Sequence, residues 1–467
     1  AYRALKAAVP SLPAERLRDA LAGRRRLYVG GGLTPRERAA LHALALGGVY
    51  FEEEEARVYP LGSTAGHLVG FTDTGGDGVA GIERAFNEDI QTAGARGETF
   101  PLAIDLRIQG ALENELRANA IDQQARGAVG IVTNVRTGEI LAVASWPDFD
   151  PNQGGRASPE AQLNRASSSL YEMGSTFKIF TTAAGLDTGV ADMNTTFDAS
   201  SALHIGGRAI NDFHAANKVM TLEEVFLHSS NIGTSRLALQ MGRDAIVRYF
   251  GAFGLLNAAP VEGAATARPV TPRNWNADTI ASASFGHAIM VTPMNIAAAV
   301  GAVANGGTFV PLTFRRLSPG RQPQGRRILR ESTSVAMLDL MRRNAVRGSG
   351  TRANVPGLRV GGKTGSANKV VGGRYSNTSV VSSFAAVFPT DGPVTRDRYL
   401  VLILVDEPRG SAASFGLRTA GFTAAPAAGR VIERIAPFLG VARAADPYAT
   451  ALGERPPLAE ETSGGVR

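Results

Sequence analysis

The stretch AVGIVTNVRTGEILAVAS, residues 128–145, decides the fold of this chain. Two apolar runs, 128–135 and 140–145, flank the four residues Arg-Thr-Gly-Glu at 136–139. Short runs rich in β-branched residues on either side of a glycine-containing turn predict a β-hairpin. We therefore expect the first two strands of a sheet here.

Three more runs with strand character occur late in the chain, at 358–366, 379–388 and 399–405. The residues between the early pair and these late runs are mostly typical of helix and loop, including 177–186. A sheet whose strands come from both ends of a domain, with helices inserted between them, is an α+β arrangement.

The N-terminal part has a different character, with short elements and glycine-rich turns up to about residue 100. Asp105 then opens a helical pattern with an apolar stripe on one side, as an N-cap does. We expect a domain boundary near this helix, since 467 residues are too many for one compact core. The tail from Asp446 onward is rich in Pro, Glu, Gly and Ser, which favours disorder.

The composition excludes several classes of function. The net charge of +7 is spread thinly, with no basic run interleaved with aromatic residues, which argues against a nucleic-acid surface. Cysteine is absent, which removes disulfides, thiol catalysis and cysteine-ligated metals. No phosphate-loop motif occurs and no apolar run reaches the length of a membrane span. No metal or cofactor is expected, because metal-ligand spacing is lacking among the six histidines, His42, His67, His204, His214, His228 and His287.

The segment Ser175-Thr176-Phe177-Lys178 is the first candidate for chemistry. A serine hydroxyl becomes a good nucleophile when a neighbouring group takes its proton. Positions i and i+3 share a helix face, so the Lys178 amine would reach the Ser175 hydroxyl if a helix starts here. The same S-x-x-K spacing recurs at Ser366 and Lys369, but in a strand region where the two side chains point apart. A lone S-x-x-K is therefore weak evidence of catalysis.

Two further motifs follow in the chain, Ser229-Ser230-Asn231 and Lys363-Thr364-Gly365-Ser366. S-x-N offers a hydroxyl to relay a proton and an amide to hold a peptide group, although a helix-capping serine is its ordinary explanation. K-T-G-S on an edge strand offers a cation and hydroxyls for a carboxylate, and its glycine lets a ligand approach the backbone. The alternative there is a strand end with a solvated lysine.

The three motifs occur in the order S-x-x-K, S-x-N, K-T-G, which is typical of serine penicillin-recognising enzymes. Only five lysines are present in the chain, and two of them, Lys178 and Lys363, fall in these motifs. Their combination is far more specific than any one of them.

These residues carry a resemblance to class B penicillin-binding proteins, the monofunctional D,D-transpeptidases. Residues 171–178 resemble the nucleophile segment of that family. Residues 137–142 and 147–152 resemble the start of its catalytic domain, and 406–408 with 424–426 resemble its end. The segments 57–60, 66–70 and 78–83 are similar to its non-catalytic pedestal domain.

The resemblance implies a pedestal, or dimerisation-like, domain at 1–120, a transpeptidase domain at 121–445 and a tail at 446–467. The expected catalytic fold is an antiparallel five-stranded sheet flanked by helices. No cofactor is implied. A β-lactamase would lack the pedestal-like part.

The resemblance also implies a mechanism of acyl transfer. Ser175 would attack the D-Ala-D-Ala carbonyl of a peptidoglycan stem peptide, and a second strand's amine would take the acyl group. Lys178 and Ser229 would move protons, and Asn231 would hold a substrate peptide group. Lys363, Thr364 and Ser366 would hold the substrate carboxylate, and Gly365 would let the substrate approach the strand backbone. The oxyanion would lie between the backbone N–H groups of Ser175 and Ser366. β-Lactams would acylate the same serine.

Residues 229–233, SSNIG, look more like the septal (cell-division) members than the elongation members of the family. An elongation-type class B transpeptidase, a β-lactamase and a β-lactam sensor remain as alternatives. The resemblance implies a catalytic part in the periplasm and an inner-membrane anchor, which this chain lacks. It also implies a membrane glycosyltransferase and other division proteins as partners.

Overall fold

The computed structural model describes residues 1–23, 26–53, 57–213, 216–318, 320–321, 323–371, 374–446 and 448. The chain forms two compact units, one of Ala1–Pro60 with Thr72–Asp77 and one of Leu61–Phe71 with Gly78–Arg467. Of the tail predicted to be disordered, only residues 446 and 448 are described, and the rest lies outside the described residues.

The first unit contains three short helices, α1 (Tyr2–Ala8), α2 (Ala14–Ala22) and α3 (Pro35–Ala43). Helix α3 begins at a capping box, in which Thr34 and Glu37 satisfy each other's backbone N–H groups. A small group of buried side chains forms the core of this first unit: Leu5, Val9, Leu12, Leu17 and Leu41.

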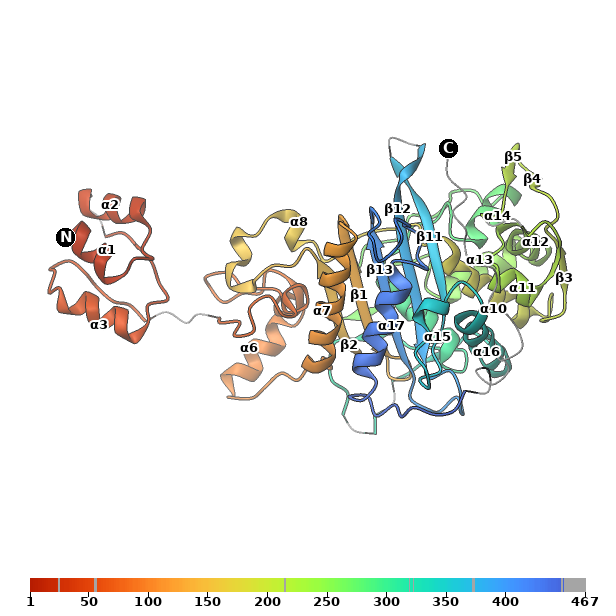
Figure 1. The fold of residues 1–467 in the computed structure, drawn as a ribbon. Coiled ribbons are helices and arrows are strands. Elements are labelled where there is room, and N and C mark those ends of the chain that lie inside the picture. Colours follow the sequence, from red (N-terminus) through yellow and green to blue (C-terminus); the bar gives the residue numbers. More distant parts are fainter. Residues whose placement is uncertain are drawn as a thin grey trace. The chain divides into compact units, whose positions relative to one another are not determined.

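A five-stranded sheet organises the second unit, and it confirms the predicted α+β fold (Figure 1). The early hairpin is β1 (Gly127–Asn134) with β2 (Ile140–Trp146), and the late strands are β11 (Gly361–Val371), β12 (Arg374–Phe388) and β13 (Tyr399–Asp406). Their order is β11-β12-β13-β1-β2, and every neighbouring pair is antiparallel. The late strand β13 pairs with the early strand β1, so segments from the two ends of the domain are neighbours in the sheet. Strand β11 lies at one edge.

Helices cover both faces of this sheet (Figure 1). Helices α7 (Leu106–Asp122) and α17 (Ala424–Ile435) pack on one face, and Asp105 caps α7 as expected. Helices α10 (Lys178–Thr188), α15 (Pro293–Ala304) and α16 (Glu331–Arg347) pack on the other. Strand β13 is buried along its whole length because its side chains alternate between these two cores.

The second unit contains further helices and strands. They are α4 (Gly66–Val69), α5 (Gly81–Ala85), α6 (Asn87–Ala95), η1 (Pro151–Arg156), α8 (Pro159–Gln162), α9 (Arg165–Ser168), η2 (Gly174–Phe177), β3 (Thr196–Asp198), β4 (Leu203–Ile205), β5 (Arg208–Ile210), β6 (Val219–Thr221), α11 (Leu222–Leu227), α12 (Asn231–Met241), α13 (Arg243–Ala252), β7 (Val261–Glu262), α14 (Ala277–Ser284), β8 (Thr308–Phe309), β9 (Leu312–Thr313), β10 (Arg326–Arg327) and η3 (Thr351–Ala353).

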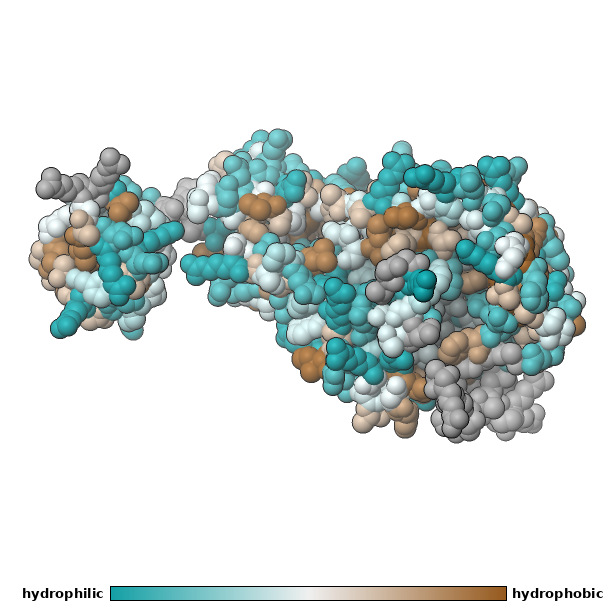
Figure 2. Space-filling view, turned by 90° about the horizontal axis from the view of Figure 1, so that it is seen from above, coloured by the Kyte–Doolittle hydropathy of each residue, from teal (hydrophilic) through white to brown (hydrophobic). Residues whose placement is uncertain are grey.

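Hydrophilic residues cover most of the face of the second unit seen in Figure 2, and hydrophobic residues form small separate groups among them. Over the described ranges of the chain, no helix combines the length and the apolar character needed to cross a membrane.

Candidate active site

The candidate nucleophile lies on a tight turn against the edge strand. Ser175 is half-buried in η2, immediately before α10. Gly174 has φ +52°, and a Cβ there would lie 2.6 Å from the carbonyl oxygen of Ser366 on β11. A glycine is needed at this position both for the left-handed backbone and for the close approach. Phe177 and Phe180, fully buried and in edge-to-face contact at 5.6 Å, anchor the start of α10 in the core.

Lys178 is the first residue of α10, and its side chain is completely buried. Its Nζ donates to Asn231 Oδ1 at 2.9 Å, to Ser229 Oγ at 3.1 Å and to the Ser229 carbonyl oxygen. The prediction paired this amine with Ser175 Oγ. The hydrogen bonds of this amine to Ser229 and Asn231 join the first two motifs, and the pairing with Ser175 stays a prediction.

The S-x-N motif occupies the break between α11 and α12. Ser229 adopts a left-handed backbone with φ +58°, which turns its hydroxyl toward the lysines. Ser230 Oγ accepts from the Gly233 backbone N–H at 2.9 Å and caps α12. The helix-cap explanation therefore applies to Ser230, the middle residue of the motif, whereas the Ser229 hydroxyl contacts the lysines.

The K-T-G motif brings a second buried lysine to the same hydroxyl. Lys363 Nζ donates to Ser229 Oγ at 2.9 Å, and its side chain is also completely buried. Thr364 Oγ1 donates to Ser349 Oγ at 2.7 Å, and Ser349 Oγ lies 3.4 Å from Lys363 Nζ. Ser349 was missed by the sequence reasoning, because the short segment that carries it follows a helix and matches none of the three motifs.

Gly365 and Ser366 continue β11 beside the nucleophile turn. A Cβ on Gly365 would lie 2.3 Å from the Met173 carbonyl oxygen and 2.3 Å from Thr176 Oγ1. This glycine therefore allows the strand and the turn to touch, beyond the ligand access expected from the sequence. Ser366 is exposed, and its Oγ accepts from the Ala420 backbone N–H at 2.9 Å.

The second S-x-x-K segment is structural. Lys369 Nζ forms ion pairs with Asp406 Oδ1 at 2.8 Å and with Glu407 Oε1 at 2.6 Å. These contacts tie β11 to the end of β13 across the sheet and leave the lysine no part in the cluster around Ser229.

Burial lowers the pKa of both lysines of the candidate site. Burial lowers the pKa of Lys178 well below its usual value, and the positive charge of Lys363 lowers it further, while Asp212 acts in the opposite direction. Burial lowers the pKa of Lys363 to about 7. Burial and the charge of Lys363 both favour the neutral form of Lys178, which is the form that a general base requires.

A second group of residues lies near this cluster. Glu172 Oε1 accepts from the Ala288 backbone N–H at 2.8 Å and from the Tyr375 hydroxyl at 3.2 Å. The His287 ring stacks on the Tyr375 ring at 5.4 Å. Burial, with a smaller effect of the Lys178 charge, lowers the pKa of His287 to about 4. The sequence reasoning took all histidines as structural or surface residues, and His214 lies outside the described residues.

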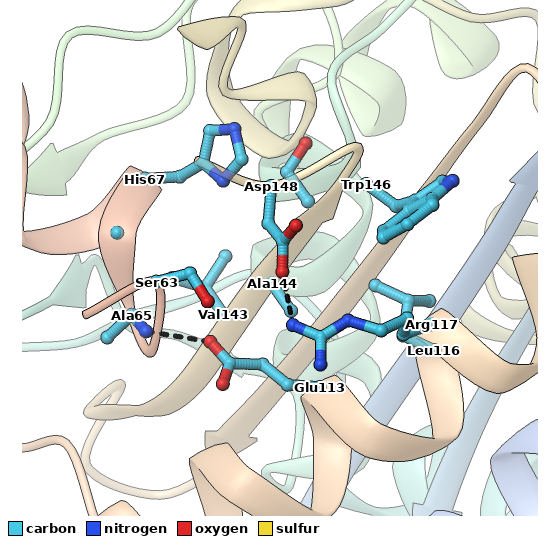
Figure 3. Close-up of a pocket in the computed structure, with 12 residues that line it drawn as sticks. Ser63, Ala65, His67, Glu113, Leu116, Arg117, Val143, Ala144, Trp146 and Asp148 are labelled. Atoms are coloured by element: carbon cyan, nitrogen blue, oxygen red, sulfur yellow. Dashed lines mark hydrogen bonds and ion pairs between the residues drawn. The ribbon is translucent and has the colours of Figure 1, made fainter. Parts of the chain in front are cut away.

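A separate pocket, shown in Figure 3, lies between α7, β2 and the segment 61–71. Arg117 forms an ion pair with Asp148, and Glu113 Oε1 accepts from the Ala65 backbone N–H at 2.7 Å. Burial raises the pKa of Glu113 and lowers that of His67 to about 4. Both groups are thus favoured in their neutral forms, as in a structural polar cluster. Within the described residues, no group of three or more His, Cys, Asp or Glu side chains is placed to hold a metal ion.

Comparison with known proteins identifies the family of this chain. The sequence model of the penicillin binding protein transpeptidase domain matches residues 128–432. FtsI of Caulobacter vibrioides, a probable peptidoglycan D,D-transpeptidase, is 56% identical over 446 residues, which are 94% of this chain and 76% of that protein. The peptidoglycan D,D-transpeptidase FtsI of Escherichia coli is 29% identical over 432 residues, 87% of this chain and 71% of that protein. Penicillin binding protein 3 of Mycobacterium tuberculosis, solved with ampicillin, has a TM-score of 0.75 and 26% identity and covers 87% of this chain and 93% of its own.

The chain therefore belongs to the penicillin-binding proteins that carry a transpeptidase domain. Within that family it is a class B protein of the FtsI type, as the septal resemblance of its sequence predicted.

Proposed function

We propose that Ser175 is the nucleophile through which this serine-type peptidoglycan D,D-transpeptidase forms an acyl-enzyme, and that Lys178 is its general base. The enzyme acts in septal cell-wall synthesis, as its likeness to FtsI proteins indicates. The observation that carries the residue assignment is the position of Ser229 Oγ, which accepts from Lys178 Nζ at 3.1 Å and from Lys363 Nζ at 2.9 Å. One hydroxyl thereby joins all three motifs.

The acylation step that we propose uses the i, i+3 spacing of Ser175 and Lys178 at the junction of η2 and α10. The neutral Lys178 amine takes the Ser175 hydroxyl proton while Oγ attacks the carbonyl carbon of the penultimate D-Ala. The carbonyl electron pair moves to oxygen, and the resulting oxyanion lies between the backbone N–H groups of Ser175 and Ser366. The positive end of the helix that starts at η2 favours this negative charge.

Collapse of the tetrahedral intermediate breaks the peptide C–N bond. The leaving D-Ala amine needs a proton, and Ser229 is placed to pass one on from the lysines that it bonds. The amine of a second stem peptide then attacks the acyl-enzyme and reverses these proton movements, which releases Ser175 and forms the cross-link.

The edge strand β11 and Asn231 orient the substrate in this proposal. The Lys363 ammonium and the hydroxyls of Thr364 and Ser366 are suited to the terminal carboxylate of the stem peptide. Gly365 keeps the strand backbone open to a ligand. The Asn231 amide holds a peptide group of the substrate. β-Lactams, which are present in the structures of Mycobacterium tuberculosis penicillin binding protein 3 solved with aztreonam and ampicillin, would acylate Ser175 of this chain as well.

The domain division proposed from the sequence assigns residues 1–120 to a pedestal and 121–445 to the transpeptidase domain. We infer a periplasmic site of action next to the inner membrane, with a membrane glycosyltransferase and other division proteins as partners. The likeness of the chain to FtsI proteins over most of its length supports this inference.

The decisive experiment is intact-protein mass spectrometry after penicillin treatment, followed by peptide mapping. The wild type is expected to gain one long-lived adduct on Ser175, and Ser175→Ala to gain none. Ser332→Ala, which removes an exposed serine on α16, is the matched control and should be acylated like the wild type. An adduct on another residue, or none, would refute the assignment.

A cross-linking assay with stem peptides then separates the reaction classes. Formation of cross-linked product supports the transpeptidase. Rapid loss of the penicillin adduct would indicate a β-lactamase, and a stable adduct without cross-linking would indicate a sensor.

A further inference from the structure

An acidic side chain outside the three motifs holds the S-x-N motif in place. Asp212 lies between β5 and β6, in a segment that the sequence reasoning gave no role. Its Oδ2 accepts from Ser230 Oγ at 2.7 Å, and its Oδ1 accepts from the Ile232 backbone N–H at 3.0 Å. Both carboxylate oxygens are thus engaged on the residues that flank Asn231.

The neighbouring residue completes this attachment. The Asn211 carbonyl oxygen accepts from Asn231 Nδ2 at 3.0 Å, which fixes the orientation of the amide. Asn231 Oδ1 is then turned toward Lys178 Nζ, from which it accepts at 2.9 Å. The segment 211–212 therefore determines which end of the amide faces the lysine.

The conformation of Ser229 needs such support. Its left-handed backbone is one that residues other than glycine adopt only where their surroundings impose it. The residues that follow it, Ser230 and Ile232, are bonded to Asp212. Loss of these bonds would free the turn that presents the Ser229 hydroxyl to both lysines.

The charges around Lys178 come from several elements. The positive charge of Lys363 on β11 lowers the pKa of Lys178, and the negative charge of Asp212 raises it. The charge of Lys178 lowers the pKa of His287, which lies after α14. Ser229 and Asn231, between α11 and α12, contribute uncharged acceptors.

We propose that Asp212 is a positioning residue for acylation, which fixes Ser229 and Asn231 against Lys178 and supplies a negative charge that faces this lysine. The proposal rests on the function assigned above to Ser175 and Lys178. Asp212 does not touch the substrate. It acts through the residues that do.

The test is the pH dependence of the second-order rate of acylation by a fluorescent penicillin, with the adduct mapped by mass spectrometry. The variants are Asp212→Asn, which removes the charge and keeps the shape, and Asp212→Ala, which removes both. Asp198→Asn is the matched control, because the exposed Asp198 carboxylate on β3 bonds to its neighbour Ser200.

The acid limb of the profile reports deprotonation of Lys178, and the alkaline limb reports loss of the Lys363 charge. For Asp212→Asn the acid limb should move to lower pH, since the attraction that favours protonated Lys178 is gone, while the alkaline limb stays in place. For Asp212→Ala the maximum rate should also fall, by about tenfold or more, because the turn is no longer held. The control should superimpose on the wild type.

The outcomes separate the two levels of the argument. If the wild type forms no adduct on Ser175, the proposed function fails and this inference with it. If the wild type is acylated there and the acid limb of Asp212→Asn coincides with that of the wild type, the role of Asp212 alone is overturned. If Asp212→Ala fails to fold, the pH profile of Asp212→Asn still tests the role of Asp212.

Discussion

Substitution of Gly365 by alanine tests whether contact between the edge strand and the nucleophile turn sets the rate of acylation. The added Cβ would lie 2.3 Å from the Met173 carbonyl oxygen, 2.3 Å from Thr176 Oγ1 and 2.7 Å from Ser383 Oγ, against 3.4 Å or more for an ordinary contact. Relief of the clash therefore needs a displacement of about 1 Å between β11 and the turn, which for catalytic groups costs roughly 10²-fold in rate. Overpacking of this kind also costs about 1–3 kcal/mol of stability.

The assay combines the rate of acylation by a fluorescent penicillin with the free energy of unfolding in urea. Gly110→Ala is the matched control, because Gly110 lies in α7 with nothing within 4 Å of an added Cβ. It should be acylated normally and gain about 0.4–1 kcal/mol. Wild-type acylation by Gly365→Ala would refute the claim that this contact positions Ser175.

Three other substitutions test separate parts of the structure. Lys178→Arg keeps a cation that stays protonated, so acylation measured by mass spectrometry should slow by about 10²–10⁴-fold, and a normal rate would contradict the role of a neutral amine as base. Asp446→Asn leaves the guanidinium of Arg342 without its partner in an ion pair whose side chains are 4% and 7% exposed, and should cost about 3–5 kcal/mol in urea unfolding. The exposed Glu433, changed to Gln, is the control and should cost less than about 1 kcal/mol. Burial raises the pKa of Glu113 in the folded state, so its ionisation opposes folding as the pH rises through that value. Glu113→Gln should therefore match the wild type in stability at low pH and exceed it at high pH, and equal stability at both would disprove this.

Much of the fold could be predicted because the strands are buried on both faces. Such strands are continuous apolar runs in the sequence, as 399–405 is, and their positions at both ends of the domain determine the α+β class. The pairing order could not be derived from the runs themselves, since any two of them could be neighbours. The family resemblance predicted a five-stranded antiparallel sheet without its strand order, and the structure confirms that sheet and shows the order.

The site was predictable where chemistry demands fixed spacing and not where it depends on distant contacts. Ser175, Ser229 and Lys363 stand in motifs that are visible in the chain. Asp212 and Ser349 reach those motifs from segments with no distinguishing pattern, because a carboxylate or hydroxyl in a loop is the ordinary case. Only the fold brings them within hydrogen-bonding distance.

The two buried lysines explain why one hydroxyl joins the three motifs. Since both nitrogens bond to Ser229 Oγ, they lie no more than about 6 Å apart, where two positive charges repel each other by roughly 3 kcal/mol or more at the effective dielectric of a protein site. The site therefore favours a single charge. The positive charge of Lys363 lowers the pKa of Lys178, which favours the arrangement with Lys363 charged. A substrate carboxylate bound at Lys363 would stabilise the charge there, and the charged Lys363 would in turn favour the unprotonated form of Lys178. Binding of the stem peptide would thus favour the protonation state in which the proposed nucleophile Ser175 is activated, and recognition and catalysis would use the same pair of lysines.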